Sequence, residues 1–250
     1  MAHYGARHWE PSCGAPVRRD RQGGTYRSYV PDPLVNRPLM VDAELDARCA
    51  QVEAVVRGLA HSPGARGLEG LARFLLRSEA LASSRIEGLQ VSAQQLALVE
   101  LADTEGIPVR GFTANARLVA NNIRALKQAA GELAEAPSIT VADITNLHRA
   151  LLPDHHPPGL RTVQNWIGGN DWHPLDADFV PPPPERVEPL MDDLALYMSG
   201  AGHSPLVQAG LVHAQFETIH PYTDGNGRVG RALIHTVLAR RDSPVPRYSR

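Results

Sequence analysis

The sequence predicts a mainly α-helical protein, and two observations support this prediction. Apolar residues recur at the three- and four-residue spacing of amphipathic helices through most of the chain. Patterns typical of strands are confined to residues 162–167 and 177–180, which flank a turn rich in Gly, Asn and Asp and predict a short β-hairpin. The predicted helices span residues 41–60, 68–87, 92–103, 112–133, 141–152, 186–199, 205–219 and 227–241.

The composition limits the classes of function. Hydrophobic residues make up 43% of the 250 residues, which is enough to bury a core. The net charge is −2 and no basic stripe is present, so we expect no direct binding of nucleic acid. No apolar run reaches the roughly 18 residues that a membrane span needs, and the N-terminus lacks the pattern of a signal peptide. Because Cys13 and Cys49 also indicate no disulfide framework, we expect a cytoplasmic protein.

The segment 220–231 reads H-P-Y-T-D-G-N-G-R-V-G-R and joins two predicted helices. We expect the second helix to begin within the G-N-G triplet, where free backbone N–H groups and the helix dipole form an anion site. Gly225 and Gly227 let the backbone approach a phosphate closely. Arg228 and Arg231 lie three residues apart on one face of the first turn, so both can reach one polyphosphate.

Two further side chains of this segment carry chemistry. Asp224 is a hard oxygen ligand suited to a Mg²⁺ ion that bridges phosphates. His220, with a reference pKa near ~6.5, suits general-base work at neutral pH. A lone G-N-G triplet would indicate an ordinary loop between helices with solvated charges. The base, the carboxylate, the glycines and the arginines together predict phosphoryl or nucleotidyl transfer.

The same segment resembles the signature of Fic-domain proteins, with Tyr222 where Phe is usual. Most characterised members are adenylyltransferases, which move AMP from ATP onto a hydroxyl of a target protein. The resemblance implies a Fic-type helical bundle with a short β-hairpin flap, in which His220 deprotonates the target hydroxyl and Asp224 holds Mg²⁺. Tyr222 can still anchor the loop, but its buried hydroxyl would need a hydrogen-bond partner.

The resemblance also assigns the residues that bind the phosphates of ATP. They are Gly225, Asn226 and Gly227 at the α-phosphate, Arg228 at the α- and β-phosphates, and Arg231 at the γ-phosphate. Gly227 favours nucleotidyl transfer, because the Doc-like branch, which phosphorylates with ATP bound in the opposite direction, typically has lysine there.

A second motif lies upstream, where a predicted helix ends in S-S-R-I-E-G. From the residues alone, Gly88 is an ordinary helix stop and Glu87 an exposed residue near the unfavourable end of the helix dipole. Ser83, Glu87 and Gly88 match the S/T-x-x-x-E-G/N pattern of the inhibitory helix in Fic proteins. The resemblance implies that Glu87 pairs with Arg231, takes the place of the γ-phosphate and so holds the enzyme inactive.

The predicted hairpin corresponds, by the same resemblance, to a flap over the active site. An edge strand has unpaired N–H and C=O groups, so it can align an incoming target segment by main-chain pairing. Phe179 and Val180 are the candidates for these flap contacts. For the tip, residues 168–174, a surface loop closed by the following prolines remains an open alternative.

The chain is expected to divide into three parts. Residues 1–30 are rich in Gly, Pro, Arg and Ser without apolar periodicity, so we expect a mobile arm. Residues 31–105 form an N-terminal helical segment with the inhibitory motif, and residues 106–250 form the catalytic core. Because residues 242–250 have no apolar period, whereas Fic proteins of this subgroup usually continue with further helices, we expect the core to lack its last helices.

The leading hypothesis is a Mg²⁺- and ATP-dependent protein adenylyltransferase that is autoinhibited by Glu87. Its partner would be a target protein with an accessible Ser, Thr or Tyr hydroxyl, and the oligomeric state, a homodimer included, stays open. Two alternatives remain. The same site could remove AMP from a modified protein, with Glu87 positioning a water and His220 returning a proton. The chain could instead be a catalytically weak regulatory or binding module.

Overall fold

A computed structural model describes residues 1–35, 37, 39–60, 65–106 and 110–241 of the chain. The described part is mainly α-helical, as predicted, and its helices follow the predicted ranges closely. They are α1 (Ala43–Ala60), α2 (Ala65–Ile86), α3 (Ala93–Glu105), α4 (Ala114–Ala130), α5 (Glu132–Glu135), α6 (Val141–Leu151), α7 (Pro184–Ser199), α8 (Pro205–Ile219) and α9 (Asn226–Arg240).

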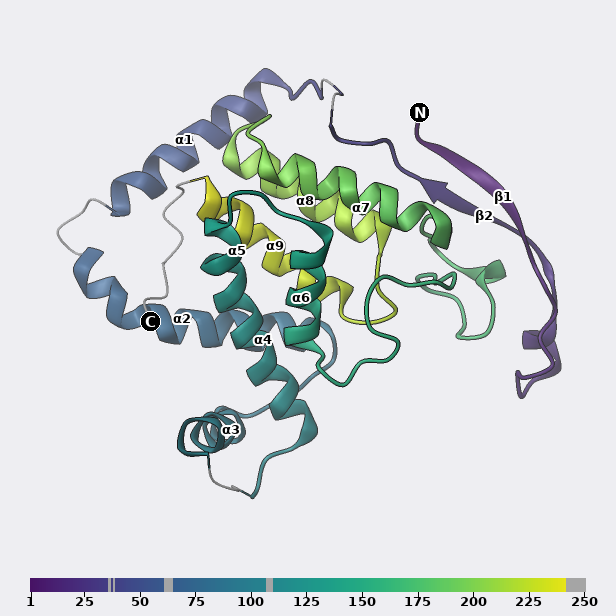
Figure 1. Ribbon diagram of the computed structural model, residues 1–250, viewed down its shortest axis with the longest axis horizontal. Coiled ribbons are helices and arrows are strands. Elements are labelled where there is room, and N and C mark those ends of the chain that lie inside the picture. The colour runs from purple at the N-terminus through teal and green to yellow at the C-terminus, as the bar shows by residue number, and fades with distance from the viewer. Residues whose placement is uncertain (36, 38, 61–64, 107–109, 242–250) are drawn as a thin grey trace.

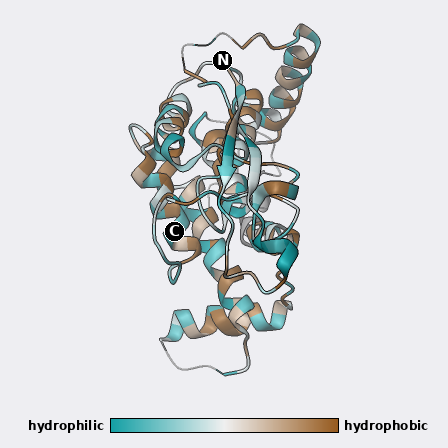
Figure 2. Cartoon of the chain, turned by 90° about the vertical axis from the view of Figure 1, so that its right-hand side faces the viewer, coloured by the Kyte–Doolittle hydropathy of each residue, from teal (hydrophilic) through white to brown (hydrophobic). Residues whose placement is uncertain are grey.

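Helices α4 and α9 form the centre of the bundle (Figure 1). Helix α9 packs against α4 and α8, and α8 packs in turn against α7 and α1. Helix α4 also contacts α2, α3 and α6. Figure 2 shows hydrophilic and hydrophobic residues interspersed along the helices, as expected when each helix buries one face. None of the described helices is both long and apolar enough to span a bilayer.

Side-chain caps mark where several helices begin. Ser92, Thr113 and Thr140 each accept a hydrogen bond from the backbone N–H three residues later. The cap at Thr140 is reciprocal, because the side chain of Asp143 accepts from the N–H of Thr140. These bonds satisfy N–H groups that have no partner inside their own helix, which fixes the start of α3, α4 and α6.

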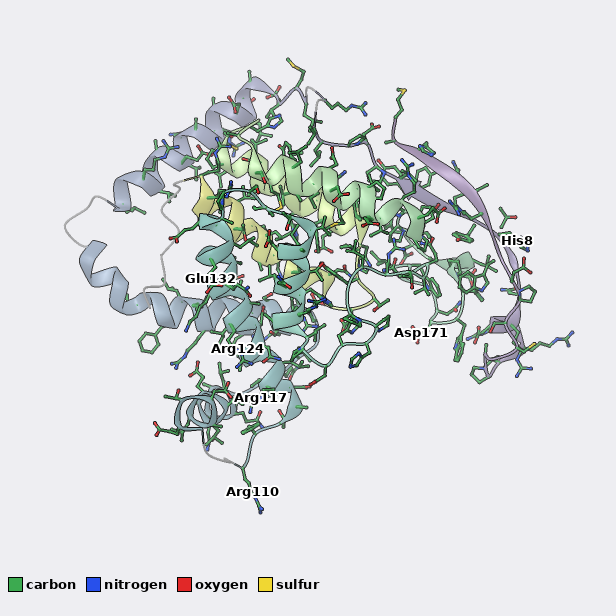
Figure 3. The ribbon with its side chains drawn as sticks, in the orientation of Figure 1. His8, Arg110, Arg117, Arg124, Glu132 and Asp171 are labelled. Atoms are coloured by element: carbon green, nitrogen blue, oxygen red, sulfur yellow. The ribbon has the colours of Figure 1, made fainter. Side chains whose placement is uncertain are left out.

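Charged side chains join two outer helices to the bundle. Glu53 of α1 is 5% exposed, and its carboxylate accepts from the N–H of Leu206 at 2.9 Å at the start of α8. Arg117 and Arg124 of α4 extend toward α3 (Figure 3). Both pair with Asp103, Arg124 at a distance of 3.0 Å.

The chain departs from the predicted helices at one interior point. Residues 112–133 form α4 and α5 rather than one helix, because Gly131 leaves the helical conformation. Its N–H closes α4 by donating to the carbonyl of Lys127 at 3.0 Å. The prediction that the core lacks its last helices concerns residues 242–250, which lie outside the described residues.

Residues 1–30, which we expected to form a mobile arm, contain two antiparallel strands instead. Strand β1 (His3–Trp9) pairs with β2 (Gly24–Val30), with His3 opposite Val30 and Trp9 opposite Gly24. The prediction that strands are confined to the flap segments was therefore wrong. In Figure 1 the pair runs along the side of the molecule that carries the flap, away from α1 and α2.

The physical reason is a period-2 burial pattern that the many Gly and Arg residues obscure. In β2 the buried residues Tyr26, Ser28 and Val30 alternate with more exposed ones, as a half-buried strand requires. The N–H of Tyr29 donates to the carbonyl of Val180 at 2.9 Å, so β2 also borders the flap.

The predicted hairpin of the flap is present as one bridged pair. Ile167 and Phe179 face each other in antiparallel orientation, with the N–H of Ile167 donating to Phe179 at 2.9 Å and the reverse bond at 3.2 Å. Gly168 and Gly169 follow Ile167 with φ of 76° and 72°, outside the extended conformation of a strand, so the ladder does not continue toward the tip.

Candidate active site

The end of α8 places His220 on the loop that leads to α9. His220 caps α8 with φ of 49° and ψ of 61°, in the left-handed region, and its N–H donates to the carbonyl of Phe216 at 2.9 Å. The backbone of a residue other than glycine is strained in this conformation. Such a residue persists only where its surroundings hold it in place, and the contacts that follow do so.

The first of these contacts comes from a buried arginine that the sequence analysis missed. Arg161 is 3% exposed, and its guanidinium donates to the carbonyls of His220 at 2.9 Å and of Ile219 at 3.3 Å. Carbonyls at a helix C-terminus lack partners and carry the negative end of the dipole, so a cation there is stabilising. Burial lowers the pKa of Arg161 to about 10, which still leaves it charged at neutral pH.

The imidazole of His220 is held between two amide side chains. Its Nδ1 accepts from Nδ2 of Asn165 at 2.8 Å and lies 3.3 Å from Nδ2 of Asn226. Burial and, to a lesser extent, the positive charge of Arg161 lower the pKa of His220 to about 4, although the Glu87 carboxylate acts in the opposite direction. The ring is therefore neutral at pH 7 and, being half-buried rather than sealed, can take up a proton.

Side chains of α6 hold the loop after His220 in place. Tyr222 is fully buried and stacks on His148 with ring centroids 3.9 Å apart and planes 11° from parallel. Its hydroxyl lies 3.4 Å from that of Thr145, which supplies the partner that a buried tyrosine needs. His148 donates from Nε2 to the carbonyl of Asp224 at 3.0 Å. Asn226 accepts from the N–H of Tyr222 at 2.9 Å and donates to its carbonyl at 2.7 Å, which closes the loop.

The start of α9 has the features of an anion site. Gly225, at φ of 82°, is the N-cap, and no side chain caps the helix. Arg228 in the first turn is 4% exposed, and its Nε and Nη1 are buried without a hydrogen-bond partner. Its Nη2 lies 3.6 Å from Oδ1 of Asp224. Burial lowers the pKa of Arg228. A buried cation with free donors at a helix N-terminus is suited to a phosphate.

Asp224 has the donor chemistry that Mg²⁺ prefers. Its side chain is 64% exposed, and Oδ1 accepts from the N–H of Gly225 at 2.6 Å. Within the described ranges no three His, Cys, Asp or Glu side chains gather as a metal-binding group. Mg²⁺ is often held by one or two carboxylates together with substrate phosphates and waters. Asp224 therefore fits a metal that arrives with a polyphosphate, and phosphate oxygens would complete its coordination.

The structure brings the upstream motif to this site. Arg231 donates from Nη2 to Oε1 of Glu87 at 2.6 Å, and its Nε donates to Oγ of Ser83 at 2.8 Å. Its Nη2 also reaches the carbonyl of Ser83 at 3.0 Å. Gly88 follows with φ of 77°, the left-handed conformation in which glycine ends a helix. The end of α2 therefore delivers one carboxylate to the arginine expected to bind a γ-phosphate.

This carboxylate lies against the first turn of α9. A Cβ added to Gly227 would lie 2.3 Å from Oε1 of Glu87 and 3.0 Å from Nη1 of Arg231. A side chain at position 227 would therefore require the Glu87 carboxylate or the Arg231 guanidinium to shift. The side chains of Glu87 and Arg231 are 35% and 19% exposed. An acidic group of the chain itself therefore occupies part of the predicted phosphate nest.

The two predicted flap residues are less free than expected. Phe179 uses its N–H and carbonyl in the bridge to Ile167. Val180 is 5% exposed, and its carbonyl accepts from Tyr29 of β2. Both sides of this short strand are thus occupied at these residues. The backbone edge predicted to receive a target segment is taken by β2 at Val180.

Two family models match the chain. One, described as Fic/DOC family, matches residues 138–238, and the other, Fic/DOC family N-terminal, matches residues 62–131. Curated relatives include Protein adenylyltransferase Fic of Nematostella vectensis, 35% identical over 116 residues, and that of Drosophila melanogaster, 31% identical over 135 residues. These matches cover 44% and 50% of this chain but only 25% and 26% of the relatives' length.

Solved structures share the fold over most of the chain. A Fic family protein from Desulfovibrio desulfuricans G20 superposes with a TM-score of 0.63 at 25% identity, covering 81% of this chain and 59% of that one. Fic-1 from C. elegans superposes with a TM-score of 0.57 at 23% identity, covering 79% of this chain and 56% of its own.

Proposed function

We propose that this chain is a protein adenylyltransferase that moves AMP from ATP onto a hydroxyl of a target protein. The chain belongs to the Fic/DOC family, because the two family models together span more than half of its residues. The names of the curated relatives support this activity. The observation that carries the proposal is the buried Arg228, whose unpaired donors lie at the uncapped start of α9, together with a neutral histidine on the loop before it.

In the proposed reaction His220 accepts the proton of a Ser, Thr or Tyr hydroxyl of the target. The freed oxygen forms a bond to the α-phosphorus of ATP while the bond from that phosphorus to the pyrophosphate oxygen breaks. AMP stays on the target and pyrophosphate leaves. Arg228 and the N–H groups of the first turn of α9 stabilise the charge on the phosphate oxygens. A Mg²⁺ ion held by Asp224 would supply further neutralisation of the phosphates.

The contact between Glu87 and Arg231 supports autoinhibition. A γ-phosphate bound at Arg231 would have to displace the Glu87 carboxylate, since both are anions and Glu87 already lies 2.6 Å from the guanidinium. With Glu87 in place, ATP would bind without the orientation that in-line attack requires. Ser83 would hold Arg231 in place with either Glu87 or a γ-phosphate bound. The contacts of Ser83 use Nε and one hydrogen of Nη2 of Arg231.

The test of the proposed activity is transfer of label from ATP to protein in a cell lysate. Compared with the same lysate without the protein, the Glu87→Gly variant should add incorporation of label from α-³²P-ATP and add none from γ-³²P-ATP, because AMP rather than phosphate is moved. Adding His220→Ala should reduce incorporation by about 10²- to 10⁴-fold, the usual contribution of a positioned base. Added incorporation from γ-³²P-ATP, or added labelling that survives the loss of His220, would contradict the proposal.

Removal of AMP is the second candidate, and the position of Glu87 favours it. Its partly exposed carboxylate lies beside Gly227 at the start of α9, where it could direct a water at an AMP–protein bond. An adenylylated protein incubated without ATP separates the two activities. Release of AMP by the unaltered protein, and not by Glu87→Gly, would favour removal. Release by neither protein would leave transfer as the activity.

A further inference from the structure

The outer edge of strand β1 carries backbone groups that its own hairpin does not use. The N–H of Tyr29 in β2 donates to the carbonyl of Val180, on the side of β2 that faces away from β1. In an antiparallel strand the N–H and carbonyl of one residue point to the same side, and the side changes with each residue. Because Tyr4 lies opposite Tyr29, its N–H and carbonyl point away from β2. The same holds for Ala6 and His8, which follow at intervals of two residues.

This edge is open in the described part of the chain. None of the described residues forms a hydrogen bond with the outward backbone groups of Tyr4, Ala6 and His8, and all three residues are exposed. Figure 1 shows β1 on the outer side of β2, and Figure 3 shows His8 at the border of the molecule. Proteins usually protect such an edge with proline, lysine or a bulge. Strand β1 contains no proline or lysine, and its register with β2 is unbroken over seven residues.

Side chains of β1 attach the strand to the folded core. Arg7, the arginine of this strand, pairs with Glu185 in the first turn of α7. Trp9 packs edge-on against Trp166 of the flap segment, with ring centroids 5.3 Å apart. The extended backbone of β1 is therefore formed before any partner arrives. A strand that is already ordered loses less conformational entropy when it pairs, which favours binding.

The edge of β1 is complementary to itself. A second β1, antiparallel and related by a two-fold axis at Ala6, would place Ala6 opposite Ala6 and Tyr4 opposite His8. All the outward groups would then pair, because opposed residues of this kind exchange both of their hydrogen bonds. Gly5 would face Arg7, so no like charges would be opposed. An axis at Arg7 would oppose two guanidinium groups, and an axis at Gly5 would place His8 beyond the end of the other strand.

We propose that β1 is a dimer interface, at which a second copy of this chain adds its own β1 edge to edge, with Ala6 on the two-fold axis. Two-fold dimers require a surface that is complementary to itself, and this register supplies one. The joined sheet would run from β2 of one copy, which borders the flap, through both β1 strands to β2 of the other. An interface made mainly of one strand edge is small, so association is reversible and depends on protein concentration. The dimer does not depend on the proposed enzymatic activity.

Disulfide cross-linking tests the register. In a Cys13→Ser/Cys49→Ser background, Ala6→Cys would place two thiols on a hydrogen-bonded pair whose Cα atoms are about 5.5 Å apart, within reach of a disulfide. His8→Cys is the matched control, because it is exposed on the same edge but its two copies would lie about 13 Å apart along the strands. Under mild oxidation Ala6→Cys should give at least about tenfold more disulfide-linked dimer than His8→Cys. Equal yields, or no dimer from Ala6→Cys, would overturn the inference.

Sedimentation velocity over a concentration series tests the association itself. The unaltered chain should show a monomer–dimer equilibrium. Ala6→Pro removes an N–H at the centre of the interface that pairing with β2 does not use, so it should raise the Kd about tenfold or more. Thr25→Pro makes the same change on the far side of β2 and should alter the Kd less than about twofold. Emission from Trp9 checks that the hairpin persists in both variants. A chain that stays monomeric, or a dimer that Ala6→Pro leaves unchanged, would contradict the proposal.

Discussion

Neutralising Glu87 should release the proposed transferase activity. The Glu87→Gln change removes the negative charge that competes with a γ-phosphate but keeps the length of the side chain. Arg231 should stay in place, because Ser83 accepts from its Nε at 2.8 Å and from its Nη2 at 3.0 Å. The guanidinium would then be free to pair with the terminal phosphate of ATP.

The size of the effect follows from one charge-assisted hydrogen bond of 2.6 Å between partly exposed groups. A hydrogen bond to a charged group contributes about 1.5–3 kcal/mol, whereas a fully exposed ion pair contributes about 0.2–1 kcal/mol. With side chains 35% and 19% exposed, the pair lies between these limits, at about 1–2 kcal/mol. We therefore expect the rate of labelling from α-³²P-ATP, below saturation, to rise about 5- to 30-fold.

Glu79 provides the matched control. It lies on α2, about two turns before Glu87, and its carboxylate is 3.8 Å from Nε2 of His235 on α9. Glu79→Gln removes an identical charge without touching Arg231, so the labelling rate should change by less than about twofold. Equal rates for the unaltered protein and Glu87→Gln, or an equal rise in both variants, would refute the competition for Arg231.

Three further outcomes follow from the geometry. In the Glu87→Gly background kcat/KM should stay constant from pH 8 down to about 5.5, because the lowered pKa of His220 keeps the base unprotonated; an acid limb near the ordinary value of 6.5 would contradict this. Arg161→Lys should lower the free energy of unfolding in urea by about 2–4 kcal/mol, because lysine cannot donate to several carbonyls as the guanidinium does. A loss below about 0.5 kcal/mol would contradict the role assigned to Arg161. Tyr222→Phe should cost less than about 1 kcal/mol in the same measurement and retain transfer, since the hydroxyl contact with Thr145 is 3.4 Å long; a tenfold loss of labelling would contradict this.

The sequence analysis predicted the parts of the site whose residues are neighbours in the chain or follow the spacing of a helix. Helix α9 begins at Asn226, inside the G-N-G triplet, because glycine at positive φ before it ends the loop. The helix that ends at Ile86 was equally predictable from its apolar stripe and from Gly88. The contact from Glu87 to Arg231 came from a family resemblance, since no local pattern links residues so far apart.

The residues that hold the site could not be found in this way. Arg161 precedes the predicted strand 162–167 and Asn165 lies within it, but a strand pattern does not indicate that both side chains donate to the carbonyl of His220, more than fifty residues later. His148 follows an ordinary helical spacing, so its stacking on Tyr222 has no signal in the sequence. Pairing of β2 with Val180 likewise depends on tertiary packing. Long-range hydrogen bonds of this kind become visible only once the chain is folded.

The competition between Glu87 and a terminal phosphate can be measured without any chemistry. Calorimetric titration of ATP and of ADP, each with Mg²⁺, into His220→Ala and His220→Ala/Glu87→Gly compares ligands that differ only in the γ-phosphate. The account predicts that loss of Glu87 tightens ATP binding about 5- to 30-fold and leaves ADP binding unchanged within about twofold. An equal gain for both nucleotides, or none for either, would show that the carboxylate and the γ-phosphate do not share Arg231.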